Sequence, residues 1–290
     1  MPDFYGRPTG VVENSQLRLE YLAQAGPRIV RLNLPGVEGN LLGEFPDIGW
    51  DTEHGYFELF GGHRLWAAPE QPSLSYLPDS EGLSVIVEGE DVELRWEPMR
   101  KGLGKHMRIS LLANRPGLHL THTITNRFDH PMVVAPWGIT VLPLGGEAYM
   151  PATPAGEGLL PDRSLVLWPY SNWDDPRLSL QRGGIVVQGE AGSPPLKIGT
   201  FAERGLCAYY RNDVLFTKQF SVEEGEYPDR GCDIEVYCSD GLIEVETLAP
   251  LSTILPGGSV SSVETWEFFT GKLASKKLQE VFFMESPNAK

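Results

Sequence analysis

The sequence has little cysteine, and the cysteines it has follow no ligand or disulfide pattern. Cys207, Cys232 and Cys238 are an odd number, and none of them form a Cys-x-x-Cys spacing. Disulfide frameworks use even numbers of cysteines, and zinc knuckles use closely spaced pairs. We therefore expect the three cysteines to pack as small apolar residues.

Positive charge and long apolar runs are also scarce. The chain has 24 Lys and Arg against 39 Asp and Glu, a formal net charge of −15. An acidic surface repels a phosphate backbone, so we expect no nucleic-acid partner. No stretch approaches the ~20 apolar residues of a membrane span, and the first residues, Met-Pro-Asp-Phe-Tyr-Gly-Arg, are unlike a secretory leader. We expect a cytoplasmic protein with no membrane partner and a neutral small molecule as its ligand.

Several catalytic motifs are missing as well. The sequence contains no Gly-x-Ser-x-Gly, no Walker or dinucleotide glycine loop, and no His-Glu-x-x-His. Phosphoryl and hydride transfer are therefore disfavoured, and we expect neither a cofactor nor a metal. A metal site assembled from carboxylates distant in the sequence would leave no motif of this kind.

What the sequence does contain is many turns. Its 32 Gly and 24 Pro fall in short clusters between short apolar runs, which is typical of many strands joined by turns. One helix is expected, over 274–281, and no βαβ alternation or repeat is visible. We predict an all-β sandwich of one domain, 1–290, with a short helical tail near 271–283. The expected strands are 17–21, 28–34, 56–60, 83–88, 92–97, 106–112, 118–125, 133–142, 164–168, 185–188, 206–211, 214–220, 234–238, 242–248 and 263–268.

Turns crowd most densely between Gly145 and Pro176. This segment could be a linker between domains. The strand signals on its two sides have the same character, however, so we interpret it as a long functional loop on a β scaffold.

The run from Gly241 to Pro250 carries two glutamates two positions apart. In a strand, Glu244 and Glu246 share one face with Leu242 and Leu248. Apolar flanks raise the pKa of a sheltered carboxyl, which is how a sheet can present a general base. If that face meets water instead, both glutamates are simply the polar side of a half-buried strand.

A second candidate is the segment from Gly61 to Glu70, where two glycines permit close backbone approach. His63 can exchange protons, Arg64 can bind oxygens in pairs, and Trp66 can stack on a sugar ring. Together they are typical of a polyol-binding corner. In the alternative interpretation Arg64 is solvated and Trp66 belongs to the core.

Four other polar residues each allow a functional and a structural interpretation. His122 falls on the apolar face of its predicted strand, which favours a hydrogen-bonded core histidine. Lys197 and Lys218 could serve chemistry or lie on the polar faces of strands. Lys218 shares its face with two phenylalanines, so an inward orientation requires a carboxylate or hydroxyl partner. Asp229, in Tyr-Pro-Asp, could bind a ligand or simply form a turn.

Four motifs together resemble the galactose mutarotase-like superfamily, which comprises aldose 1-epimerases and related carbohydrate-binding proteins built on a β-supersandwich. They are the segments 61–70, 126–136, 227–229 and 243–250. The resemblance implies an all-β supersandwich with few short helices. In the enzymes a late strand carries a glutamate base in a Leu-Glu-Thr-Gln-like run, which matches Glu246. The early sugar-binding arginine matches Arg64, with His63 beside it.

The resemblance departs at Trp137, where the mid-chain segment of aldose 1-epimerases reaches a histidine that serves as general acid. This departure favours a divergent branch of the superfamily. If anomers are interconverted, Glu246 would act as base, with His63 as the first candidate for the acid and Lys218 as the second. The alternative is a non-catalytic carbohydrate-binding or sugar-sensing protein. The residues expected to bind the sugar are Arg64, Trp66, Trp137, Lys218 and Asp229.

Overall fold

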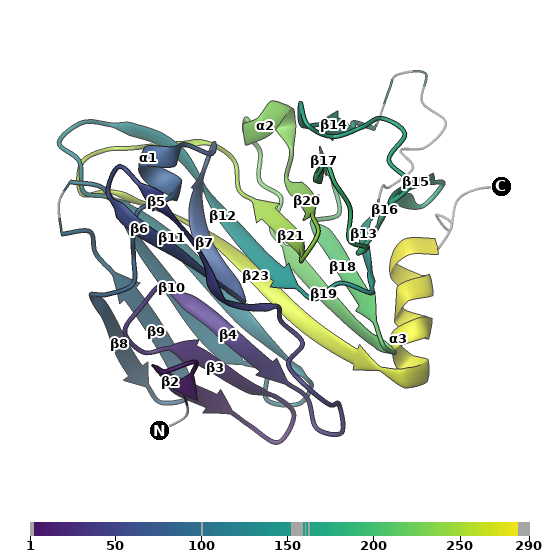
Figure 1. The fold of residues 1–290 in the computed structure, drawn as a ribbon, viewed down its shortest axis with the longest axis horizontal. Helices are drawn as coiled ribbons and strands as arrows, with labels where there is room; N and C mark the ends of the chain where they lie inside the picture. The colour runs from purple at the N-terminus through teal and green to yellow at the C-terminus, as the bar shows by residue number, and fades with distance from the viewer. Residues whose placement is uncertain (1–2, 100, 152–158, 160, 162, 284–290) are drawn as a thin grey trace.

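The computed structural model describes residues 3–99, 101–151, 159, 161 and 163–283, and these build two large sheets and a hairpin (Figure 1). All strand pairs in this part of the chain are antiparallel, for example β1 with β2 and β8 with β9. The first sheet contains, in spatial order, β1 (Asp3–Phe4), β2 (Arg7–Glu13), β3 (Arg18–Leu22), β4 (Arg28–Asn33), β7 (His63–Ala68), β12 (Met132–Leu142), β21 (Ile243–Leu248), β20 (Ile234–Cys238), β17 (Leu196–Thr200) and β14 (Val166–Leu167), with β22 (Ser252–Ile254) paired to β12.

The second sheet and the hairpin account for the remaining strands. In spatial order the second sheet contains β15 (Leu178–Gln181), β16 (Gly184–Gln188), β13 (Glu147–Pro151), β18 (Leu206–Arg211), β19 (Val214–Phe220), β23 (Ser259–Thr270), β11 (Gly117–Asn126), β10 (Leu103–Leu111), β9 (Asp91–Trp96) and β8 (Leu83–Glu88). The hairpin is β5 (Glu44–Thr52) and β6 (Gly55–Gly61). The predicted all-β sandwich is confirmed.

The main core lies between the two large sheets. Alternate residues of the first sheet, such as Leu65 and Val245, are buried there with Met107 and Trp266 from the second sheet. The period of two in each strand supplies this face. Burying these side chains is the dominant favourable contribution to folding.

The first sheet is buried on its other face as well, over its central strands. A separate apolar cluster covers this outer face, where Phe57 and Leu59 of the hairpin meet Trp66, Trp137 and Leu248 of the sheet. All six residues of β7 and of β21 are buried as a result. The polar side chains that β7 and β21 place on this outer face are therefore enclosed by protein.

Gly61 and Gly62 make the close approach that the sequence predicts, directly before β7. Gly62 has φ +66°, and a Cβ there would lie 1.9 Å from the carbonyl oxygen of Ile29. A Cβ on Gly61 would lie 2.2 Å from the carbonyl oxygen of Gly43. Only glycine fits these positions, so the pair determines where β7 enters the sheet.

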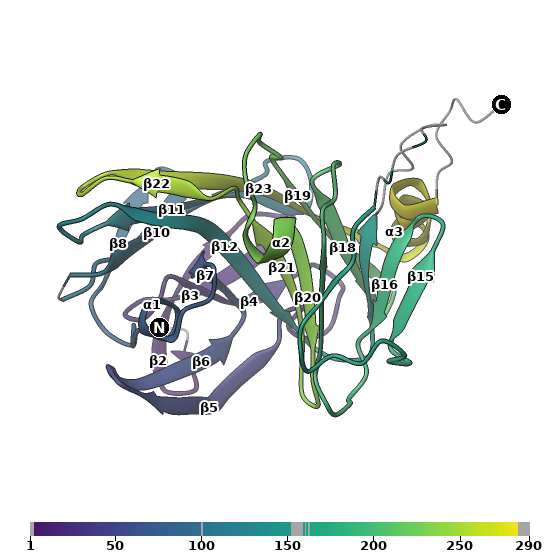
Figure 2. The same cartoon turned by 90° about the horizontal axis from the view of Figure 1, so that it is seen from above.

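The described residues also form three short helices and a π-helical turn: α1 (Pro72–Ser75), α2 (Pro228–Gly231), α3 (Gly271–Leu278) and η1 (Gln279–Phe283). Both views place α3 at the end of the molecule opposite the β5–β6 hairpin (Figure 2). Ala274 and Leu278 of α3 pack on Leu215 and Val186 of the second sheet. No helix in the described ranges is long and apolar enough to cross a membrane.

Candidate functional site

Strand register places the candidate residues in rows across the first sheet. Ile139 of β12 pairs with Arg64 of β7 on one side and with Glu246 of β21 on the other. Glu246 in turn pairs with Glu235 of β20. Side chains in one such row point to the same face, and here that face is the outer one. The next row contains Thr140, His63 and Val245 and faces the core.

The outer face carries a cavity of about 520 Å³ between the sheet, the hairpin and the loop after β14. Its aromatic lining consists of Trp50, Trp66, Tyr76, Trp137, Tyr170 and Tyr237. Its charged lining consists of Arg64, Glu70, Lys197, Glu244 and Glu246. The volume is in the range of small-molecule sites, and the mixture of rings and charges is typical of them. Tyr170 belongs to the segment interpreted as a functional loop, of which residues 152–158, 160 and 162 lie outside the described residues.

Arg64 and Glu244 form the first charged pair of the cavity. Arg64 Nη1 lies 2.9 Å from Glu244 Oε1, and the guanidinium lies 4.3 Å from the centroid of Trp66. Burial raises the pKa of the Glu244 carboxyl, and the nearby Arg64 offsets only part of that effect. Arg64 is only 2% exposed, so its side chain is enclosed by the cavity walls and not solvated.

Lys197 joins two carboxylates in the second charged group. Its Nζ lies 2.8 Å from Glu235 Oε2 and 3.1 Å from Glu246 Oε2. Burial alone would lower the pKa of the ammonium, but the carboxylates of Glu246 and Glu235 outweigh it and raise that pKa well above its usual value. Burial raises the pKa of Glu235 well above its usual value, against the opposing effect of Lys197. These shifts favour the protonated forms of Lys197 and Glu235.

The two carboxylate oxygens of Glu246 differ in their hydrogen bonds. Trp137 Nε1 donates a hydrogen bond of 2.8 Å to Oε2, the same oxygen that Lys197 approaches. Oε1 has no hydrogen-bond partner among the described residues, and neither has the indole N–H of Trp66. A buried acceptor and a buried donor without partners, both in the wall of one cavity, favour a ligand with hydroxyl groups.

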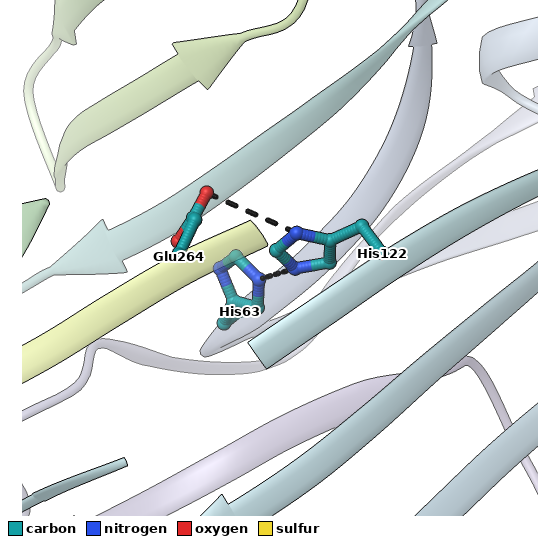
Figure 3. Close-up of side chains that lie close together, drawn as sticks. All are labelled: His63, His122 and Glu264. Carbon is teal, nitrogen blue, oxygen red and sulfur yellow. Dashed lines mark hydrogen bonds and ion pairs between the residues drawn. The ribbon is translucent and has the colours of Figure 1, made fainter. Parts of the chain in front are cut away.

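His63 lies on the opposite side of the sheet from Glu246. Its Nδ1 is 3.0 Å from Thr140 Oγ1, and its Nε2 is 2.8 Å from His122 Nε2 (Figure 3). Both imidazoles are fully buried between the sheets. Burial first, and then the neighbouring charges, hold the pKa of His63 well below its usual value. The geometry therefore does not bring His63 to the cavity as an acid, and the prediction of a core His122 is confirmed.

Lys218 also belongs to this internal network. Its Nζ donates to the carbonyl oxygen of Gly138 at 3.2 Å and to Thr247 Oγ1 at 3.3 Å, and it lies 3.5 Å from Glu264 Oε2. The carboxylate and hydroxyl partners expected for an inward Lys218 are thus present. Neither Lys218 nor the half-buried Asp229 of α2 is among the cavity-lining residues.

One cluster in the described ranges brings metal-ligating side chains together: His63, His122 and Glu264, with ligand atoms within 4.8 Å of one another (Figure 3). The ammonium of Lys218 already neutralises the Glu264 carboxylate, and the indole N–H of Trp266 donates to it at 2.6 Å. A fixed positive charge at this distance disfavours a divalent cation. We interpret the cluster as a hydrogen-bonded core network.

The structure brings Arg64, Trp66, Trp137 and Glu246 together, and it adds residues that the sequence did not select. The sequence leaves Lys197 open between a chemical role and the polar face of a strand, it offers Glu244 as a possible neighbour of the base, and it gives Glu235 no signal beyond strand alternation. Sequence alternation marks all three as polar-face residues, but only the packing of the hairpin shows that this face is enclosed.

Comparison of the sequence with protein-family models and with curated proteins gave no match. Comparison of the fold gave many. A galactose mutarotase-like protein from Lactobacillus casei is similar over 90% of this chain and 100% of its own, with a TM-score of 0.57 and 12% identity. A galactose mutarotase related enzyme from Lactobacillus acidophilus is similar over 92% of this chain and 99% of its own, with a TM-score of 0.51 and 10% identity.

A third similar structure is longer than this chain. The TPR-domain containing protein from Parabacteroides distasonis has a TM-score of 0.62 and 11% identity, and the match covers 98% of this chain. This chain spans about half the length of that protein, since the match covers 50% of it. The matches to the two Lactobacillus proteins show that the chain has the galactose mutarotase-like fold.

Proposed function

We propose that the cavity on the outer face of the first sheet binds a sugar and that Glu246 exchanges a proton with its anomeric hydroxyl. The observation that carries this proposal is the free Oε1 of Glu246, which is buried in a wall that also contains Trp66, Trp137 and Arg64. Indole faces stack on the apolar faces of sugar rings, and a guanidinium binds pairs of hydroxyl oxygens. The galactose mutarotase-like fold supports the same proposal.

In this proposal the reaction is the interconversion of sugar anomers. Glu246 Oε1 accepts the proton of the anomeric hydroxyl, a second group gives a proton to the ring oxygen as its bond to the anomeric carbon breaks, and the ring closes again on the other face by the reverse steps. Trp137 and Lys197 hold the second oxygen of the carboxylate, so Oε1 stays oriented toward the ligand. A positioned proton-transfer group contributes about 10²–10⁴-fold to a rate.

The experiment follows the optical rotation of freshly dissolved α-D-glucose and α-D-galactose with and without the protein. We expect the approach to equilibrium to be faster with the protein, and expect Glu246→Gln to fold normally and lose this acceleration. A rate equal to that of buffer with both sugars would contradict the catalytic proposal for them. Unchanged activity in Glu246→Gln would contradict the choice of base.

A second candidate function is non-catalytic sugar binding or sensing. It is favoured by one observation: the described lining of the cavity contains no imidazole, and Trp137 lines the wall where the aldose 1-epimerase pattern leads to a histidine. In that case sugars should quench the fluorescence of the cavity tryptophans without any change in the rate of mutarotation. Absence of quenching by every member of a panel of aldoses would contradict sugar binding itself.

A further inference from the structure

We propose that Lys197 is the proton donor to the ring oxygen, and that Glu235, behind it, returns the proton to Lys197. The inference rests on the proposed function, because it supplies the acid that the anomer interconversion by Glu246 requires. Neither residue belongs to the set that the sequence resemblance suggested. Lys197 would contact the sugar directly, whereas Glu235 would act only through Lys197.

The first argument is the position of Lys197 in the cavity. The anomeric hydroxyl oxygen and the ring oxygen are bonded to the same carbon, so the base and the acid must lie side by side. Lys197 lines the cavity, and its Nζ is 3.1 Å from the carboxylate of Glu246. His63 and Lys218, by contrast, are fully buried and bridge the two sheets on the core side.

The second argument is that several contacts fix the position of the Lys197 ammonium. Lys197 Nζ lies 4.7 Å from the ring centroids of both Trp137 and Trp168, in addition to its two carboxylate contacts. Indole faces attract cations, and two of them together hold the long side chain in one place. A proton donor must lie within hydrogen-bond distance of its acceptor, and these contacts limit the positions that Nζ can adopt.

The third argument is the location of Glu235. It is fully buried, does not line the cavity, and has Lys197 as its ion-pair partner at 2.8 Å. A carboxyl enclosed in this way prefers its neutral, protonated form. Burial raises the pKa of Glu235, and its contact at 2.8 Å is with Lys197, which lines the cavity, so in this proposal a proton of Glu235 passes to the amine of Lys197.

The proton count balances without an external reactant. Glu246 Oε1 takes the proton of the anomeric hydroxyl, the bond from the anomeric carbon to the ring oxygen breaks, and the hydroxyl becomes a carbonyl. The ring oxygen takes a proton from the Lys197 ammonium, and the carboxylic proton of Glu235 passes to the neutral amine. Glu246 has then gained one proton and Glu235 has lost one, and no electron pair leaves the system. Ring closure on the opposite face reverses each transfer.

Several other titratable groups face Lys197 or Glu235 from the elements packed against them. They are Glu246, Glu244, Tyr76, Tyr170, Tyr237, Cys232 and Asp229. Because the carboxylates among them interact with Lys197 and with one another, the pH profile reports the group and not one residue. The comparison between variants is therefore more informative than any single profile.

The experiment measures mutarotation of α-D-glucose and α-D-galactose by polarimetry for four chains: wild type, Lys197→Arg, Glu235→Gln and Lys105→Met. An arginine keeps the positive charge between the two carboxylates but does not release its proton near neutral pH. We expect Lys197→Arg to reduce kcat about 10²-fold or more, the range of general acid catalysis, with a smaller change in KM. Lys105→Met is the matched control, because Lys105 is a buried lysine that is ion-paired with Asp79 away from the cavity.

Glu235→Gln has a separate readout in the pH profile. In the wild type we expect the rate to fall at alkaline pH as Glu235 loses its proton, and we expect Glu235→Gln to be slower at neutral pH and to lack that fall. A merely structural role of Glu235 would lower the rate at all pH values and leave the shape unchanged, which would overturn its assignment. Circular dichroism of each variant checks folding, and Lys197→Met provides a second test of the donor if the arginine is not accommodated.

The outcomes distinguish this inference from the proposed function. If the wild type accelerates a sugar and folded Lys197→Arg or Lys197→Met stays within twofold of it, Lys197 is not the donor while the proposed function stands. If the wild type accelerates neither sugar, the proposed catalysis itself fails for these sugars, and the proton relay fails with it.

Discussion

Arg64 and Glu246 lie on the same face of the first sheet because both are register partners of Ile139, one on each side of β12. They are 182 positions apart in the sequence. His63 is the direct neighbour of Arg64 in the chain, yet it points to the opposite face and is buried between the sheets. Strand geometry thus separates neighbours and joins distant residues in one cavity.

Removing the charge of Arg64 should weaken ligand binding. Arg64→Gln deletes the partner of Glu244 at 2.9 Å and the guanidinium that lines the cavity. Charged hydrogen bonds contribute about 1.5–3 kcal/mol, so we expect at least a tenfold loss of affinity for a bound aldose, measured by tryptophan fluorescence. Arg177→Gln is the matched control, because this buried arginine pairs with Asp175 outside the cavity. Equal losses in the two variants would contradict a direct role of Arg64.

The indole of Trp137 should matter for catalysis more than for folding. Trp137→Phe removes the hydrogen bond of 2.8 Å to Glu246 Oε2 and keeps an aromatic ring. We expect kcat to fall about tenfold, because the loss of one hydrogen bond to a charged group is worth about 1.5–3 kcal/mol and Lys197 still holds the same oxygen. Trp266→Phe removes the corresponding bond to Glu264 in the core. That control should lower stability and leave kcat unchanged; the reverse pattern would contradict the assignment.

The pair His63 and His122 should make the fold sensitive to acid. Burial lowers the pKa of both imidazoles in the folded chain, whereas the unfolded chain binds protons near pH 6.5. The unfolded state therefore binds more protons below that pH, and stability falls as the pH decreases, by up to about 1.4 kcal/mol per pH unit for each histidine. Urea unfolding at pH 8, 6 and 5 measures this slope.

Variants test whether the two histidines cause the slope. His122→Gln should have a smaller dependence between pH 6.5 and 5, whereas exchange of the exposed His130 for Gln should change nothing. The two imidazoles are hydrogen-bonded to each other, so their protonation steps belong to the pair. An unchanged slope in His122→Gln would show that other groups are responsible.

Asp233, directly before β20, should destabilise the fold at neutral and alkaline pH. Burial raises the pKa of its carboxyl to about 7, against backbone hydrogen bonds that lower it, of which the one from Ala202 is 2.7 Å long. The folded state then holds a proton that the unfolded state loses near pH 4, so stability is lost as the pH rises toward 7.

An isosteric amide should relieve this loss. Asp233→Asn keeps the acceptor for Ala202 without the buried charge, and we expect it to be more stable than wild type at pH 8, on the order of a few kcal/mol. Thermal unfolding at pH 4, 6 and 8 should show the gain increase between about pH 4 and pH 7. A gain that is the same at all three values would contradict a charge effect.

The breaking of the internal ion pair at Lys218 should affect stability alone. Lys218→Met leaves Glu264 with a negative charge in the core, and removal of one partner of a buried pair costs about 3–5 kcal/mol. The variant should unfold at lower urea concentration, while the activity of the remaining folded protein stays normal. Loss of kcat in a folded Lys218→Met would instead favour a catalytic Lys218.

Local patterns predicted much of the fold, and they failed where pairing partners decide the structure. The alternation in β21 was sufficient to place Glu244 and Glu246 on one face. The segment that forms β5 contains a proline and a glycine and shows no alternation, and its register with β6 shifts between Phe45 and Gly49. It becomes a strand through its partner β6 and its packing on the sheet, which is information that the segment itself does not carry.

The sequence by itself determined the all-β class, the close approach at Gly61 and Gly62, and the common face of Glu244 and Glu246, since these follow from local backbone geometry. Only the tertiary structure decided that this face is a cavity, that Lys197 lines it beside Glu246, and that Glu235 lies against Lys197. Strand order across β17, β20 and β21 brings these charges together, and the hairpin and loops enclose them. Burial and proximity set the proton affinities of such groups, and neither is a property of a residue and its neighbours in the chain.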